Sequence, residues 1–369
     1  MALEALSTSD WHLGGMYKPL GGRAAELQFN EIHKVYHYGL EHGVPRIFVP
    51  GDISDSPTLD EENMIRLVTL LVTYDDEIET HYMRGNHDVK SKFKTSLDLL
   101  AVLADAGVFK RFKLHTKANT SMIDGVNVSF LPWPSFEAPK ADNGKGRLIF
   151  AHIEAIGAIG DNGRPLKAGN EEKVIRTADD YIVSGHIHQY QELKKKRMMY
   201  VGTLYQKNFG ESLPKGFIHF KAGYKKGESK LQFKHDFINS RPNFVLESKV
   251  IKGPEDFADL KADPNIRYKL FVDRNAGVII PKHLTQKFPN IVHISGVNTK
   301  GMSMEEVLEA TRGESVTAGD LPQINPMMGL KPFLRKEGLD KGSMKKARSY
   351  VQEAMRHVSA VNAKNRAAA

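Results

Sequence analysis

Residues 184–189 read S-G-H-I-H-Q and directly follow an apolar, β-branched run at residues 181–183. A short run of this kind that ends in glycine predicts a strand passing into a loop, with His186 and His188 at its mouth. Two histidines separated by one residue are, taken alone, more often unrelated side chains than a metal site. The pair becomes informative because segments further upstream contain the additional Asp, Asn and His residues that a metal site needs as ligands.

Metal-binding residue types follow other predicted strands in the same way. Apolar and β-branched residues predict strands at 3–9, 44–50, 78–83 and 147–151. Each strand ends in a polar segment, and these segments are Asp10-Trp11-His12, Gly51-Asp52, Gly85-Asn86-His87-Asp88 and His152. Ligands of open α/β sheets bind beyond the carboxyl ends of the strands, so we expect these side chains to converge.

The residue types in these segments suit a pair of transition metals. The chain contains no cysteine, which excludes disulfides and thiolate ligands. Imidazole and carboxylate suit Mn, Fe, Zn or Ni, and two such ions about 3.5–4 Å apart can clamp a phosphate for in-line displacement. Each residue alone has another interpretation: Asp10 as a helix cap, Asp52 as a turn residue and Asn86 as a left-handed turn former. All five segments in this order favour the metal centre.

Helices and strands alternate early in the chain, and strands dominate up to about residue 240. Helices are predicted at 27–40, 60–72, 95–106 and 171–177, and further strands at 127–133, 198–201, 216–221 and 230–237. This order favours an α/β sandwich in which helices cover sheets. Residues 239–243 look like a boundary. Beyond it, strands at 244–250, 268–273 and 291–294 and a helix near 254–263 predict a small module.

The C-terminal end is basic. From Lys331 onward there are ten Lys and Arg against three Asp and Glu, so most of the net charge of +8 lies there. Apolar residues recur at helical spacing from Met344 to Val361, with basic residues opposite. Such an arm suits nucleic acid or an acidic partner, or it is a merely solvated helix. With no apolar run near the ~20 residues that span a bilayer and no signal-peptide pattern, we expect no membrane partner and a cytoplasmic location.

The ordered segments D-x-H, G-D, G-N-H-D, H and G-H-x-H resemble the calcineurin-like metallophosphoesterases over residues 1–240. The resemblance implies a metallophosphoesterase α/β sandwich, with two sheets flanked by helices, and two divalent metal ions. The implied metal ligands are Asp10, His12 and His188 for one ion, Asn86, His152 and His186 for the other, and Asp52 as the bridge. The resemblance also implies that His87 stabilises the transition state or protonates the leaving oxygen, and that Asp88 orients His87.

Three further stretches resemble the SbcD-type DNA nucleases: T-S-D-W-H-L-G at residues 8–14, Y-V-G-T-L-Y at 200–205 and N-F-G-E at 208–211. This resemblance, which extends to shorter bacteriophage versions, implies a Mn²⁺-dependent nuclease (Mg²⁺, Fe²⁺ and Zn²⁺ being alternatives). Its implied actions are 3′-to-5′ exonuclease cleavage of duplex ends and endonuclease cleavage of single strands and hairpins, in recombination and repair.

The same resemblance implies partners and a domain plan. The partners are DNA and an SbcC-like ABC-type ATPase subunit, with a homodimer inside a heterotetramer. Residues 1–240 would be the nuclease domain, 241–300 a small α+β DNA-capping domain, and 301–369 a linker and basic helical partner-binding arm. Residues 241–300 show no motif that matches the capping domain of the family.

Two other functions stay open. A small phosphodiesterase or a phosphatase would use the same metal centre. Residues 51–56 read G-D-I-S-D-S, however, and not the G-D-x-V-D-R-G of protein phosphatases, and a small phosphodiesterase would not need residues 241–369. A non-catalytic scaffold for an ATPase is disfavoured, because degenerate relatives usually lose ligands and all seven implied ligands are present here.

Overall fold

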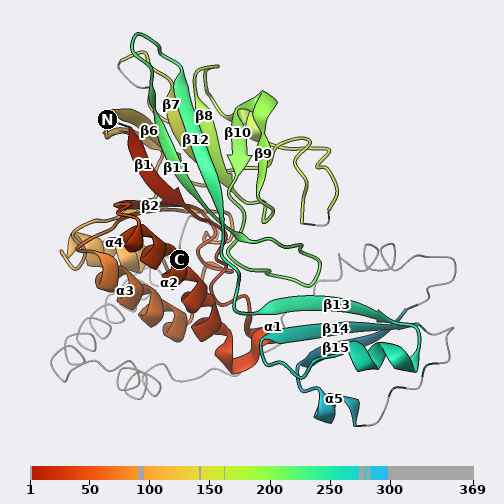
Figure 1. Cartoon of the computed structure of the whole chain (residues 1–369). Coiled ribbons are helices and arrows are strands. Elements are labelled where there is room, and N and C mark those ends of the chain that lie inside the picture. The colour runs from red at the N-terminus through yellow and green to blue at the C-terminus, as the bar shows by residue number, and fades with distance from the viewer. Residues whose placement is uncertain are drawn as a thin grey trace, which may run out of the picture.

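The computed structural model describes residues 2–89, 95–140, 143–161, 163–273, 278, 280 and 283–297 (Figure 1). Two six-stranded sheets make up most of this part of the chain. The first sheet contains, in spatial order, β12 (Leu231–Asn239), β11 (Gly216–Tyr224), β1 (Leu3–Ser7), β2 (Arg46–Pro50), β3 (Glu79–Met83) and β4 (Phe112–His115). Strands β1 to β4 run parallel, whereas β11 is antiparallel to both β1 and β12.

The second sheet lies against the first and, like it, contains four adjacent parallel strands. In spatial order it contains β5 (Asn119–Ile123), β6 (Val126–Leu131), β7 (Arg147–His152), β8 (Tyr181–Gly185), β10 (Met198–Tyr200) and β9 (Gln191–Leu193). The four central strands are parallel, and the two edge strands are antiparallel to their neighbours. Both sheets therefore bring the carboxyl ends of several strands to one edge.

Three helices cover the outer face of the first sheet: α2 (Ala24–Glu41), α3 (Glu61–Tyr74) and α4 (Asp98–Asp105). Before α2 the chain makes one short helix, α1 (Tyr17–Leu20), and the turn η1 (Gly21–Arg23). The apolar face of α2, including Ile32 and Val35, is fully buried in the same core as Ile47 of β2. Helix α3 begins where the Asp60 carboxylate accepts the backbone N–H of Asn63 at 3.0 Å, so Asp60 is its N-cap.

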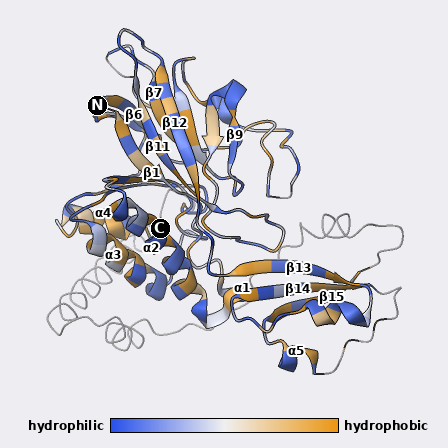
Figure 2. Ribbon diagram, in the orientation of Figure 1, coloured by the Kyte–Doolittle hydropathy of each residue, from blue (hydrophilic) through white to orange (hydrophobic). Residues whose placement is uncertain are grey.

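Aromatic residues fill the space between the two sheets. The ring of Phe48 on β2 stacks on that of Phe150 on β7 with centroids 4.4 Å apart, and Phe130 on β6 packs beside them. Burying an aromatic or large aliphatic side chain contributes about 1.5–3 kcal/mol each. Figure 2 shows hydrophobic residues along the strands of both sheets. The predicted sandwich of two sheets flanked by helices is confirmed.

The outer face of the second sheet is covered differently. Loop residues between 153 and 175, including Ala155, Ala158 and Val174, pack on Ile149 and Ile182. The helix predicted at 171–177 is only the single 3-10 turn η3 (Glu171–Lys173), and a second turn, η4 (Lys194–Lys196), connects β9 to β10. The loop leaves its polar residues close to the ends of β7 and β8, where the candidate site lies.

A third, parallel sheet of three strands follows, in the order β13 (Val245–Ile251), β14 (Ile266–Asp273) and β15 (Ile291–Val297). The helix predicted near 254–263 is the 3-10 turn η5 (Pro254–Asp259), and α5 (Leu284–Lys287) precedes β15. Both pack on one face of the sheet, where Leu270 is fully buried. The boundary at 240/241 stays a prediction, and the arm predicted at 301–369 lies outside the described residues.

Most strands and helices lie within a few residues of the predicted positions. Strands β4, β5 and β9 are absent from the prediction. They are three to five residues long, and β5 and β9 have little apolar alternation, whereas β4 (F-K-L-H) alternates but spans only four residues. In the described ranges, none of the helices combines the length and the apolar character that crossing a bilayer requires.

Candidate metal centre

The nine residues predicted to form the site lie at the carboxyl ends of β1, β2, β3, β7 and β8 or just beyond them. Backbone hydrogen bonds connect the segments after β1 and β2: the N–H of Asp10 donates to Gly51 O at 3.1 Å, and the N–H of His12 donates to Asp52 O at 3.0 Å. The loop after β1 is thereby held against the loop after β2. The convergence of side chains that the sequence predicts for parallel strand ends is present in the structure.

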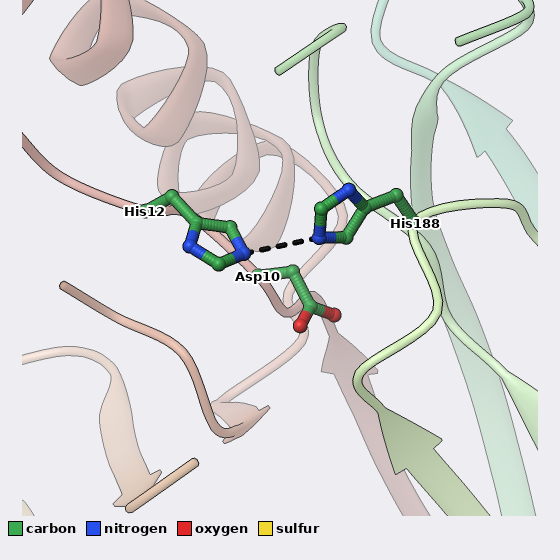
Figure 3. Close-up of side chains that lie close together, drawn as sticks. All are labelled: Asp10, His12 and His188. Atoms are coloured by element: carbon green, nitrogen blue, oxygen red, sulfur yellow. Dashed lines mark hydrogen bonds between the residues drawn. The ribbon is translucent and has the colours of Figure 1, made fainter. Parts of the chain in front are cut away.

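One group consists of Asp10, His12 and His188, whose candidate ligand atoms all lie within 4.8 Å of one another (Figure 3). The Nε2 atoms of His12 and His188 face each other at 3.0 Å. All three residues are buried. The Asp10 carboxylate accepts the backbone N–H of His186 and the hydroxyl of Ser9, which fixes its direction. At this separation the two imidazole nitrogens are able to share a proton or to bind one cation together.

The second group consists of Asn86, His152 and His186. The Asn86 Oδ1 atom lies 2.9 Å from His152 Nε2 and 2.9 Å from His186 Nδ1, and these two nitrogens are 3.3 Å apart. Since His152 Nδ1 donates to the carbonyl of Pro50 at 2.9 Å, the Nε2 atom of His152 is the one left to bind a ligand. The three side chains therefore direct two nitrogens and one oxygen at a common point.

Asp52 lies between the two groups. Its Oδ2 atom is 3.2 Å from His152 Nε2 and 3.7 Å from His12 Nε2, so one carboxylate reaches both. Burial acts to raise the pKa of Asp52, but His152 and His12 outweigh it and hold the pKa well below its usual range. An ionised carboxylate with this reach is the residue that a bridge between two cations requires.

The donor set fits a pair of divalent cations. Burial, together with the nearby Lys207 ammonium, lowers the pKa of His12 to about 4, which keeps this imidazole neutral as ligation requires. Around His152, burial acts to lower the pKa, but Asp52 outweighs it and raises the pKa to about 9. The site therefore attracts positive charge. When bound, two divalent cations would supply Lewis acidity to a phosphate and to an attacking water.

Strained backbone marks the same residues. Seven non-glycine residues in the described ranges have positive φ, and four of them are predicted ligands: Asp10 (54°), His12 (44°), Asp52 (51°) and His186 (91°). Such conformations cost about 1–3 kcal/mol each and persist where the surrounding structure imposes them, which is typical of functional sites. Each bend turns a side chain out of its strand direction and into the site.

Two glycines in the motifs are required by close approach. A Cβ atom on Gly85 would lie 2.1 Å from Asp52 Oδ1, and one on Gly51 would lie 2.3 Å from His152 Nδ1. Gly51 also has a φ of +98°, which side chains other than glycine rarely adopt. The glycines of G-D and G-N-H-D therefore make room for the ligands of the site.

The structure corrects one predicted role. The buried Asp88 carboxylate accepts from Ser54 N (2.8 Å), Ser54 Oγ (2.8 Å), Gly85 N (2.8 Å) and Ile53 N (3.3 Å), and His87 is not among these donors. The atom that orients His87 is the carbonyl oxygen of Asp55, 2.9 Å from His87 Nδ1. Burial, reinforced by Asp52, raises the pKa of Asp88 to about 6. Asp88 thus joins the loops after β2 and β3.

Several polar residues around the site were given no role by sequence reasoning. Lys207 Nζ lies 3.0 Å from His12 Nδ1 and 2.7 Å from Asp55 Oδ1, and Glu154 Oε1 lies 3.0 Å from His186 Nε2. Asp161 and Glu211 both contact His188. They come from loops without regular periodicity, so only the N-F-G-E stretch, which contains Glu211, carried a signal.

The sequence of residues 5–190, half of the chain, matches the family described as calcineurin-like phosphoesterase. The chain belongs to this family. Membership implies a metal-dependent phosphoester hydrolase, and the His and Asp groups of this calcineurin-like phosphoesterase are able to bind metal. The matched range ends two residues after His188, so it contains all seven predicted ligands.

Solved structures similar to this calcineurin-like phosphoesterase include an archaeal phosphodiesterase (11% identity, 64% of this chain and 99% of that chain, TM-score 0.32). A dimetal phosphatase from Danio rerio is 12% identical, with 64% and 99% covered and a TM-score of 0.38. GAP50, the anchor in the inner membrane complex of Plasmodium, is 12% identical, with 81% and 98% covered and a TM-score of 0.39. At these values the likenesses carry no argument about substrate.

Proposed function

We propose that this phosphoesterase is a Mn²⁺-dependent DNA nuclease. It would act as a 3′-to-5′ exonuclease on duplex ends and as an endonuclease on single strands and hairpins, in DNA recombination and repair. Support comes from the segments 8–14, 200–205 and 208–211, which resemble SbcD-type nucleases and lie together around the site. The hydroxyl of Tyr205 donates to the carbonyl of Trp11, and Gln28 Nε2 donates to both Tyr205 Oη (2.8 Å) and Trp11 O (3.2 Å).

The single observation that carries the nuclease proposal is the attachment of β13 to the loop beside the metal centre. The amide of Gln206 pairs with Leu246 in both directions: Leu246 N donates to Gln206 Oε1 at 3.0 Å, and Gln206 Nε2 donates to Leu246 O at 3.1 Å. Ser248 Oγ also donates to Phe209 O at 3.2 Å. A small phosphodiester needs no such neighbour, whereas a polymeric substrate extends beyond the metals and needs a second surface to position it.

In this proposal the residues of the chain divide the work. The implied ligands hold the scissile phosphate through the two cations. His87, whose Nδ1–H donates to the Asp55 carbonyl, would act in its doubly protonated form. It would give the Nε2 proton to the leaving alkoxide as the phosphodiester bond breaks and remain as the neutral Nδ1–H tautomer. Trp11 has no exposed surface and packs edge-on against Tyr82, so it supports the fold and is not a stacking platform for a base.

The proposed partners follow from the same resemblance. They are an SbcC-like ABC-type ATPase subunit and a second copy of this chain, in a heterotetramer built on a homodimer. The basic arm at 301–369 would bind the ATPase or DNA phosphates. Deleting residues 331–369 and measuring ATPase binding tests the arm separately from catalysis.

A cleavage assay tests the proposed function. The purified full chain with Mn²⁺ is expected to degrade linear duplex DNA from its ends and to nick hairpin and single-stranded DNA. Absence of DNA cleavage, with and without the ATPase, contradicts the proposal. Hydrolysis of bis-p-nitrophenyl phosphate by a preparation that leaves DNA intact would favour a small phosphodiesterase.

A further inference from the structure

A fully buried ion pair, which the catalytic scheme does not use, lies directly behind His188. Glu211 and Lys215 have side chains only 2% exposed, and Glu211 Oε2 lies 2.7 Å from Lys215 Nζ. The other carboxylate oxygen, Oε1, lies 2.9 Å from His188 Nδ1. Burying two charges costs several kcal/mol per ion, and apolar side chains could fill the same space without this cost.

Every polar atom of the pair is bonded. Glu211 Oε1 also accepts from Asn208 Nδ2 at 2.8 Å, and Oε2 accepts from the backbone N–H of Lys207 at 3.2 Å. Lys215 Nζ donates to the carbonyl of His188 at 2.9 Å. The pair therefore holds His188 at two points, since the carboxylate contacts the ring and the ammonium contacts the backbone.

The bond at Nδ1 determines what Nε2 can do. With the Nδ1 proton donated to Glu211, a neutral His188 presents an unprotonated Nε2 to the site, where it faces His12 Nε2. Asp161 adds a second acceptor, with Oδ2 2.8 Å from Nδ1 and Oδ1 accepting the backbone N–H of His188 at 3.1 Å. The Asp161 side chain is about a third exposed, so Glu211 is the more rigid of the two acceptors.

Two other uses of this cluster fit less well. The candidate ligand atoms of Asp161, His188 and Glu211 lie within 4.8 Å of one another, which is close enough for a third metal ion. The Lys215 ammonium already supplies the positive charge there, and a divalent ion would lie beside it. The adjoining cavity, bordered by Asp161, Glu211 and Lys215, has a volume of about 80 Å³. That is far below the about 300–1,000 Å³ of small-molecule sites.

We propose that Glu211 is a positioning residue that holds His188 for metal binding, and that Lys215 fixes Glu211 in place. The inference rests on the two-metal centre of the proposed function and names how one of its ligands is held. A carboxylate that accepts from the far nitrogen of a ligand histidine sets the tautomer and makes the imidazole a better donor, and its loss weakens metal binding about 10–100-fold.

The test measures metal binding by the full chain, without DNA. Isothermal titration with Mn²⁺ is expected to give two ions per wild-type chain, and Glu211→Gln should weaken binding of one of them about 10–100-fold. Cobalt-loaded protein adds an independent readout, since the visible bands of Co²⁺ should shift in Glu211→Gln. The proposal would be overturned if Glu211→Gln bound Mn²⁺ with wild-type affinity and showed unchanged Co²⁺ bands. It would also be overturned if the wild type bound three ions and Glu211→Gln bound two, because Glu211 would then be a ligand of a third ion.

A matched control separates positioning from general loss of a buried charge. Glu31 is another buried carboxylate, paired with Lys34 Nζ at 2.7 Å, and it contacts no histidine of the site. Glu31→Gln should reduce the free energy of unfolding without changing Mn²⁺ affinity. Equal weakening of Mn²⁺ binding in Glu31→Gln and Glu211→Gln would contradict a specific role for Glu211.

A double variant protects the test against misfolding. Glu211→Gln leaves Lys215 buried without its counter-charge, whereas Glu211→Gln/Lys215→Met removes both charges and should fold. The double variant is still expected to bind one Mn²⁺ ion more weakly, because His188 Nδ1 loses its buried acceptor Glu211 and keeps only the partly exposed Asp161. Wild-type binding by a folded double variant would refute the proposal. If the wild type binds two ions but does not cleave DNA, the nuclease proposal is contradicted, whereas the positioning role of Glu211 is not affected.

Discussion

The ring of His87 meets that of His12 edge-on, with centroids 4.7 Å apart and planes at 87°. One of these imidazoles is buried among ligand atoms, and the other is partly open and held by a backbone carbonyl. Adjacent histidines thus have different surroundings. The nuclease proposal gives them different roles, with His12 as a metal ligand and His87 as the proton donor.

The first prediction concerns His87. His87→Ala should lower kcat for DNA cleavage by about 10²–10⁴-fold, the usual contribution of general acid catalysis, because the leaving alkoxide loses its proton donor. Mn²⁺ stoichiometry should stay at the wild-type value. Single-turnover cleavage and metal analysis on the same samples check both parts. Wild-type cleavage by this variant would remove His87 from the mechanism.

A second prediction concerns the residue between the two groups. Asp52→Asn removes the negative charge that reaches both His12 and His152, so at least one of the two Mn²⁺ ions should be lost. Asp76→Asn makes the same chemical change at a largely exposed carboxylate far from the site and should leave metal content unchanged. Metal analysis after dialysis distinguishes them, and full retention of both ions by Asp52→Asn would contradict the bridging role.

The third prediction tests close approach in the glycine motifs. Gly85→Ala puts a Cβ atom against Asp52, so Asp52 or the loop after β3 must move. We expect weaker Mn²⁺ binding and a lower free energy of unfolding. Gly22→Ala is the control, because a Cβ atom there meets nothing within 4 Å, and its unfolding free energy should stay within about 0.5 kcal/mol of wild type. Urea unfolding and Mn²⁺ titration of both variants provide the comparison.

The fourth prediction concerns acid stability away from the metals. Burial, with His81 nearby, lowers the pKa of His115 to about 3, and burial also lowers the pKa of His81 despite its bond to Glu79. His115 stacks on Phe130 with centroids 3.5 Å apart, and His81 Nδ1 lies 3.0 Å from His115 Nε2. Both rings are therefore neutral between the sheets at pH 7.

The sign follows from comparing folded and unfolded chains. An unfolded histidine titrates near pH 6.5, so below that pH the unfolded chain binds more protons, and stability falls as the pH falls toward 3. The slope is about 1.4 kcal/mol per pH unit for a fully shifted group. His115→Gln should flatten this loss between pH 6.5 and 4 in metal-free protein. An unchanged slope in urea unfolding would show that His115 is not responsible.

The sequence predicts the sandwich because its strands are short apolar runs whose ends are marked by Asp, Asn and His. Parallel strand ends meet at one edge, so residues as distant as Asp10 and His188 could be assigned to one site from their positions alone. The short edge strands were not predicted, because β9 consists of Gln191, Glu192 and Leu193 and has no apolar alternation.

Contacts that depend on loop geometry were beyond sequence reasoning. Asp88 was expected to orient His87, but the turn after Gly85 directs its carboxylate back toward Ser54, and the Asp55 carbonyl contacts His87 Nδ1 instead. The adjacency of Glu211 to His188 depends on how two irregular loops fold together, and no periodicity encodes that. The left-handed backbone at Asp10, His12 and Asp52 could not be predicted from the sequence either, because Asp and His do not themselves require positive φ.

The amide of Gln206 has a mechanical consequence. Besides its paired bonds to Leu246, its nitrogen donates to the carbonyl of Glu211 at 2.7 Å. The Gln206 side chain thus connects the three-stranded sheet to the loop that contains Glu211, whose carboxylate contacts His188. A displacement of β13 would therefore act, through these three hydrogen bonds, on the backbone of Glu211 beside His188.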